Sequence, residues 1–271
     1  QQATANSCDN AGKSALKKKD YKTAQAHYEQ SLKARLEIYG TEPHPDTAKS
    51  YMGLGLACRG LKDYQKALDY LKQSLEIRLR VNGTKAHPSV ATSYHNLGNV
   101  CRDQESYRDA EHYYEQALEI FQKCVNKDDR RIKLVTKNLG QIRGAIAQKK
   151  SAAVDHDSQA EACLKQQDYK QAQVHYAQAL EMRQKLYGTK PHAEVAKSYY
   201  HLGQVHFAQR NYEEATEHYE KAQSIYIECL GEDHPDTQRT AAALEEVYMA
   251  FSLEEEETAA QDAKQLTTQT E

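Results

Sequence analysis

The side chains best able to bind a metal ion in this sequence are its 12 histidines. They recur at intervals along the chain, as His44, His87, His192 and His234 do, and no His-x-x-x-His pair has a third ligand beside it. A protein zinc site brings three or four ligands together. The spacing therefore predicts no metal site. It favours helix-entry loops for His44-Pro45-Asp46 and His234-Pro235-Asp236, because proline and an acidic residue suit the first turn of a helix.

Motifs for nucleophilic catalysis or phosphate transfer are also missing from the sequence. There is no nucleophile elbow, zinc-hydrolase motif or glycine-rich phosphate loop. Gly12-Lys13-Ser14 resembles the end of a phosphate loop, but the upstream glycine and a preceding strand are absent. We therefore predict that the protein is not an enzyme and uses no cofactor.

A tyrosine-led motif is repeated along the chain. Tyr64 lies 43 residues after Tyr21, Tyr107 lies 43 after Tyr64, and Tyr212 lies 43 after Tyr169. Similar sequences follow each of these tyrosines, in residues 20–32, 63–75, 106–118, 168–180 and 211–223. Within one repeat, residues 89–122, apolar residues at i, i+3, i+4 and i+7 predict two amphipathic helices with a break near residues 103–106. A fixed period of this length predicts a solenoid of helix pairs.

The repeat resembles the tetratricopeptide repeat, through its glycine, two spaced alanines, and the tyrosine that precedes the second helix. The long period and the Gly-x-x-x-His-Pro connector are similar to the subclass found in kinesin light chains and nephrocystin-3-like proteins. The resemblance covers about residues 6–251. It implies an all-α solenoid of helix-turn-helix repeats that winds as a right-handed superhelix, used for protein binding.

The period breaks once, which predicts the domain organisation. Tyr169 lies 62 residues after Tyr107, which leaves room for one unpaired helix at residues 129–149, and a second unpaired helix is expected at 235–251. We predict five full repeats and two unpaired capping helices. The predicted parts are array one (1–150), array two (151–252), and a polar acidic tail (253–271) that is partly disordered. The alternative is one continuous superhelix, in which the lone helix is an insertion. Residues 1–5 are expected to form an uncapped leader.

The six cysteines follow the same repeat. Cys58 and Cys101 are 43 residues apart, and Cys163 takes the same place in a later repeat. Equivalent residues of stacked helices lie about 10 Å apart, which is too far for a disulfide. We therefore expect free, mostly buried thiols and a cytoplasmic protein. The first residue is Gln, so the chain is expected to be a fragment or a processed protein.

In the family that the chain resembles, the first helix of each repeat lines a concave groove. The register of the first helices places polar and charged side chains there: Asn10, Lys13, Lys49, Arg59, His95, Asn96, Asn99, Arg102, Lys137, Asn138, Lys197, Tyr200, His201 and Gln204. Asp9 and Asp157 fall on the same predicted face. The other interpretation is that these residues are only the solvated side of amphipathic helices.

Kinesin light chains use an Asn-rich groove with basic residues for acidic peptides, and Asn96 and Asn138 lie in matching Asn-Leu-Gly contexts. Gly53 and His201 depart from that pattern. We predict a scaffold or adaptor that binds a peptide or helical segment of a partner, with acidic peptides favoured. The alternative is a regulatory, sensor or oligomerisation module of a larger multidomain signalling protein. The net charge of −3 makes nucleic acid a poor partner. The sequence has no apolar run of 18 residues, so we predict no membrane span. Homo-oligomerisation stays open.

Overall fold

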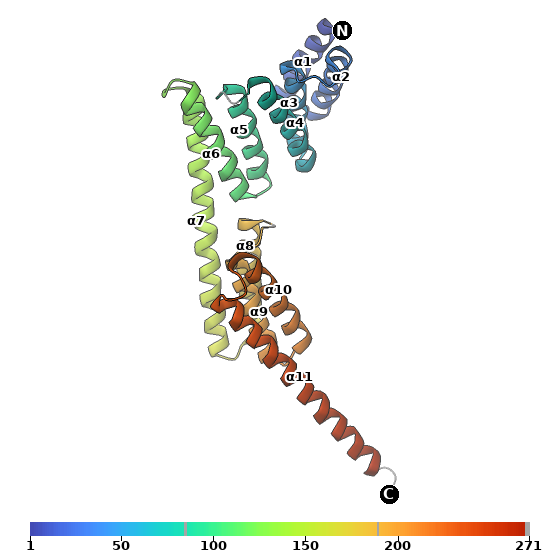
Figure 1. Cartoon of the computed structure of the whole chain (residues 1–271), viewed down its shortest axis with the longest axis vertical. Coiled ribbons are helices and arrows are strands. Elements are labelled where there is room, and N and C mark those ends of the chain that lie inside the picture. Colours follow the sequence, from blue (N-terminus) through green and yellow to red (C-terminus); the bar gives the residue numbers. More distant parts are fainter. Residues whose placement is uncertain (84–85, 189, 269–271) are drawn as a thin grey trace. The chain divides into compact units, whose positions relative to one another are not determined.

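The computed structural model describes residues 1–83, 86–188 and 190–268, with side chains described as far as residue 258. The described residues form α-helices joined by turns and irregular segments. These eleven helices pack pairwise as consecutive helix-turn-helix repeats (Figure 1). They are α1 (Gln2–Lys17), α2 (Tyr21–Tyr39), α3 (Pro45–Gly60), α4 (Tyr64–Asn82), α5 (Pro88–Asp103), α6 (Tyr107–Cys124), α7 (Arg130–Lys165), α8 (Tyr169–Tyr187), α9 (Ala193–Ala208), α10 (Tyr212–Leu230) and α11 (Pro235–Thr268). The chain divides into unit 1, Gln1–Ile146, and unit 2, Ala147–Glu271.

The turn inside each repeat is made by one residue in the left-handed region. Lys19, Lys62, Glu105, Gln167 and Arg210 have φ between 59° and 64°. In three repeats the next residue is an aspartate whose carboxylate accepts the backbone N–H three residues on, as Asp20 does from Thr23 at 3.2 Å. This side chain satisfies one of the free N–H groups at the start of the second helix.

The connectors between repeats use histidine as the helix cap. Nδ1 of His44 accepts the backbone N–H of Asp46 at 3.1 Å, and His234 accepts that of Asp236 at 3.2 Å. His87 and His192 do the same at the starts of α5 and α9. The predicted helix-entry role of His44 and His234 is confirmed.

In the core of each repeat, small residues face the rings of tyrosines or the side chains of leucines. Alanine at five equivalent positions of the second helices is completely buried: Ala24, Ala67, Ala110, Ala172 and Ala215. Glycine on the first helix lets a buried ring approach closely. A Cβ built on Gly98 would lie 2.7 Å from the ring of Tyr114, and one on Gly203 would lie equally close to Tyr219. Tyr114 and Tyr219 are therefore core residues.

Three predicted boundaries differ from the structure. The predicted end of the unpaired helix at residue 149 lies inside α7, since residues 145–165 contain neither glycine nor proline and nothing stops the helix. The predicted leader is wrong because α1 begins at Gln2 and Ala5 is buried. In the described part of the predicted tail, α11 continues as helix to Thr268. The limits of the two predicted arrays and the tail stay a prediction.

Candidate peptide-binding face

The predicted site residues of unit 1 lie on α1, α3, α5 and the part of α7 before residue 147, which we call the first-helix face. Asn10, Lys13 and Lys137 are exposed. Lys49 is exposed as well, and its ammonium pairs with Asp46 at 2.7 Å. This face therefore presents the cationic side chains of Lys13, Lys49 and Lys137 to solvent.

Two arginines from neighbouring repeats meet on this face. Arg59 Nε of α3 donates to one carboxylate oxygen of Asp103 at 2.7 Å, and Arg102 Nη2 of α5 donates to the other oxygen at 2.9 Å. The side chains of all three residues are about a quarter to a third exposed. Because two guanidinium groups share one carboxylate, the cluster carries an excess positive charge. Arg59 and Asp103 also line a hollow of about 300 Å³ together with Leu56.

Beside the arginines, a row of contacts joins α5, α6 and α7. The Asn138 amide donates to Nε2 of His95 at 3.1 Å, and the His95 and Tyr114 rings lie 5.7 Å apart. The Tyr114 hydroxyl donates to the side-chain oxygen of Asn99 at 2.8 Å. Asn99 and Asn138 are each less than a tenth exposed. The amides of Asn99 and Asn138 are therefore already hydrogen-bonded within the protein, whereas the half-buried amide of Asn96 has no described partner.

The predicted site residues of unit 2 mostly contact one another. His201 stacks on the buried ring of Tyr176 at 4.9 Å, and its Nδ1 lies 3.0 Å from Oε1 of Gln204. Tyr200 is buried against Tyr219. Lys197 and Gln204 are the exposed members of this set. Unit 2 thus offers fewer free polar groups at these positions than unit 1 does.

The structure contains two buried ion pairs that the sequence analysis did not predict. Asp9 of α1 binds Arg35 of α2 through both carboxylate oxygens, at 2.6 and 3.3 Å, and Ser31 donates to it as well. Asp157 binds Arg183 in the same way. The four side chains are no more than a tenth exposed. The prediction that Asp9 and Asp157 line the groove is therefore wrong. The signal was present, since an acid precedes an arginine by 26 residues in both repeats.

Comparison with protein families agrees with this architecture. The model of the tetratricopeptide repeat matches residues 1–80, 81–123 and 194–269, and a second tetratricopeptide repeat model matches residues 158–228. The chain belongs to the tetratricopeptide repeat family. No curated protein matches it.

Several solved structures of other proteins are similar to this tetratricopeptide repeat protein. BtubC (BKLC) from P. vanneervenii is 23% identical, with 83% of this chain and 80% of that chain covered and a TM-score of 0.40. A putative kinesin light chain of Podosopora anserina is 18% identical, with 85% and 98% covered and a TM-score of 0.46. The TPR2AB domain of yeast Sti1, in its complex with pHSP90, is 12% identical, with 92% and 100% covered and a TM-score of 0.42.

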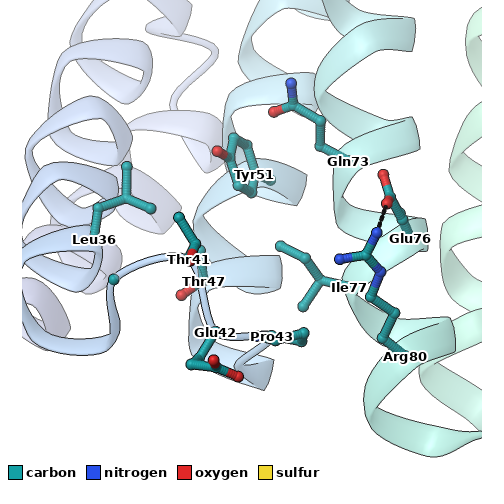
Figure 2. A pocket seen from close by; sticks show the side chains of 11 residues that line it. Leu36, Thr41, Glu42, Pro43, Thr47, Tyr51, Gln73, Glu76, Ile77 and Arg80 are labelled. Carbon is teal, nitrogen blue, oxygen red and sulfur yellow. Dashed lines mark hydrogen bonds and ion pairs between the residues drawn. The ribbon is translucent and has the colours of Figure 1, made fainter.

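A different surface of the tetratricopeptide repeats carries a hollow of about 250 Å³ between α2 and α4 (Figure 2). Thr41, Glu42 and Pro43 of the connector form part of its wall. Figure 2 shows Arg80 and Glu76 pointing toward each other across one helical turn, where they form an ion pair of 2.5 Å. Because the cation of this hollow is already paired, we do not place a charged ligand there.

The remaining predictions concern metals, thiols and membranes. The residues that the structure describes contain no group of three or more His, Cys, Asp or Glu side chains able to hold a metal ion. All six cysteines are free thiols, and burial raises the pKa of Cys101 to about 12, which keeps it protonated and unreactive at neutral pH. None of the helices in the described ranges is apolar enough over a sufficient length to cross a membrane.

Acid is expected to destabilise unit 1 through His95. Burial, followed by the charges of Arg102 and Arg59, lowers the pKa of His95 to about 4, from 6.5 in an unfolded chain. Between pH 6.5 and 4 the unfolded chain therefore binds a proton that the folded chain refuses, so stability falls as the pH falls, by up to about 3 kcal/mol. The free energy of unfolding of the His95→Gln variant, measured by urea titration, should depend less on pH across this window than that of wild type. Parallel pH profiles for the two proteins would contradict the assignment.

Proposed function

We propose that the first-helix face binds an extended, acidic peptide segment of a partner protein, and that the chain serves as a non-enzymatic scaffold. The observation that carries the proposal is the cluster of Arg59 and Arg102 on the single carboxylate of Asp103. A guanidinium group offers several N–H donors in a plane, so each of these arginines can bind a peptide carboxylate while it keeps Asp103.

The charge balance of the whole face supports an acidic ligand. The acids of α1, α3 and α5 are already in ion pairs: Asp9 with Arg35, Asp46 with Lys49, and Asp103 with the two arginines. Lys13 on α1 and Lys137 on α7 are exposed cations that have no described partner. A bound acidic peptide would therefore meet positive charge on every helix of the face.

An extended backbone also finds suitable groups here. Asn10 and Asn96 present side-chain amides that are exposed or half-buried, and an amide can donate to a peptide carbonyl and accept from a peptide N–H at once. The row formed by His95, Asn138 and Tyr114 lies beside the arginines and joins α5, the helix of Arg102, to α6 and α7. A rigid support lowers the entropic cost of binding.

Selection from a displayed library of random peptides tests this function. The wild-type chain is expected to enrich peptides rich in Asp and Glu. A variant that carries Lys13→Glu, Arg102→Glu and Lys137→Glu should bind the enriched peptides about tenfold more weakly or worse, because like charges now face each other.

A matched control keeps the same change in net charge on the second helices. Lys22→Glu, Lys33→Glu and Lys72→Glu replace exposed lysines of α2 and α4, and this variant should retain peptide binding. Both variants are first compared with wild type by circular dichroism and urea unfolding. Equal binding by the two variants, or enrichment of peptides without acidic residues, would refute the proposal. Such a result would favour the alternative of a regulatory or oligomerisation module.

A further inference from the structure

Arg78 of α4 is a buried cation without an acidic partner among the described side chains. It is 6% exposed. Its Nη1 donates to the backbone oxygen of Ser89 at 2.6 Å and to Ser93 Oγ at 2.9 Å, and its Nη2 lies 3.3 Å from Met52 Sδ. Neutral oxygens and a thioether stabilise a guanidinium less well than a carboxylate does. A buried charge of this kind is costly unless something pairs with it.

The equivalent arginines of two other repeats show what is missing. Arg35 and Arg183 each donate to a serine Oγ on the next first helix, at 2.6 Å, as Arg78 does to Ser93. Each also holds both oxygens of an aspartate that lies 26 residues earlier, Asp9 or Asp157. At the corresponding place before Arg78 the chain has Met52. The second repeat therefore has the arginine and lacks the internal carboxylate.

A hollow of about 280 Å³ lies against Arg78, between the starts of α3 and α5 and the end of α4. Its wall includes Lys49, a residue of the first-helix face, and His87. The backbone N–H of Ser89 donates to Nδ1 of His87, so the proton of the neutral imidazole sits on Nε2 as a donor. The hollow thus offers a buried guanidinium and an imidazole N–H as donors suited to an anion, and it adjoins the Lys49 ammonium, which is paired with Asp46 at 2.7 Å.

We propose that this hollow, which we call the Arg78 hollow, binds a carboxylate group brought by a partner peptide. In taking that carboxylate from an acidic peptide, the inference rests on the proposed function. A carboxylate is favoured over other anions because it is the group that the chain itself places against Arg35 and Arg183. The source is either an Asp or Glu side chain or the C-terminal carboxylate of the peptide.

The test replaces the missing acid. Met52→Asp supplies an internal carboxylate in the position that Asp9 has beside Arg35, and Met52→Leu removes the sulfur without adding charge. Fluorescein-labelled hexaglutamate serves as the probe, with its C-terminus either free or amidated, and binding is followed by fluorescence anisotropy. Met52→Asp is expected to bind about tenfold more weakly than wild type, and Met52→Leu to bind as wild type does. Loss of affinity on amidation assigns the C-terminal carboxylate, and equal affinity assigns a side chain.

A second readout separates this inference from the proposed function. Sodium glutarate, at the same ionic strength as a sodium chloride control, should raise the melting temperature of wild type and Met52→Leu but not of Met52→Asp. If hexaglutamate does not bind wild type while glutarate still stabilises it in this pattern, the peptide function fails and the carboxylate site stands. If hexaglutamate binding is lost in the Lys13, Arg102 and Lys137 variant but kept in Met52→Asp, the peptide function stands and the Arg78 hollow is refuted. Stabilisation by inorganic phosphate alone would also overturn the assignment.

Discussion

Replacing Asp157 by alanine is expected to lower the free energy of unfolding of unit 2 by about 3–5 kcal/mol. Asp157 is the acid that is buried together with Arg183, and Ser198 is its neutral partner. Without Asp157 the guanidinium, 3% exposed, keeps only the Ser198 hydroxyl and the half-exposed carboxylate of Glu194, 3.4 Å away. A buried charge left with so weak a partner costs more than most single substitutions do.

Urea unfolding followed by circular dichroism measures this loss, and amide hydrogen exchange in α8 and α9 assigns it to unit 2. Asp155→Ala is the matched control, since Asp155 lies two residues earlier on the same helix and is exposed. It should change stability by less than about 0.5 kcal/mol. The double variant Asp157→Leu with Arg183→Met should regain much of the loss, because it removes both charges. Equal losses for Asp155→Ala and Asp157→Ala would show that the pair is not buried as described.

Gly98→Ala and Gly140→Ala are expected to change stability in opposite directions, although both glycines follow Asn-Leu on a first helix. A Cβ on Gly98 would lie 2.7 Å from two ring carbons of Tyr114, which is buried and cannot move away. We expect a loss of about 1–3 kcal/mol from this overpacking. A Cβ on Gly140 would meet no atom within 4 Å, so alanine should stabilise the helix by about 0.5–1 kcal/mol.

The pair serves as its own control, since the substitution and the sequence context are the same. Melting temperatures and urea midpoints of the two variants give the comparison directly. Losses of similar size in both proteins would mean that Gly140 is covered by another part of the structure. Unchanged stability in Gly98→Ala would mean that the first and second helices of the third repeat are less closely packed than described.

The helix pairs could be predicted from the sequence because the 43-residue period and the turn residues agree. Tyr21, Tyr64 and Tyr107 each mark the first residue of a second helix, and His44-Pro45-Asp46 is a helix start. The continuity of α7 is harder to predict, because a break in the 43-residue period suggests a break in the helix as well. The residues themselves were informative, since residues 145–165 lack the glycine or proline that a turn needs.

The candidate site was less predictable than the fold, because a helical register gives the direction of a side chain and not its partner. Asp9 lies at the edge between the first-helix face and the partner helix, and it is buried because the long side chain of Arg35 reaches its carboxylate. Asn99 is likewise directed inward, because its side-chain oxygen accepts the hydrogen bond of the Tyr114 hydroxyl. The contact of Arg59 with Arg102 through Asp103 joins residues 43 and 44 positions apart, so it emerges only when two repeats are stacked.

Photo-crosslinking of a benzophenone-bearing hexaglutamate peptide to the full chain, with mass spectrometry to locate the linked residues, tests the central claim most directly. We predict crosslinks on α1, α3, α5 and the part of α7 before residue 147, which disappear in the Lys13→Glu, Arg102→Glu, Lys137→Glu variant. Crosslinks concentrated on α2, α4 and α6 or in unit 2, or a pattern that the three substitutions leave unchanged, would contradict the account.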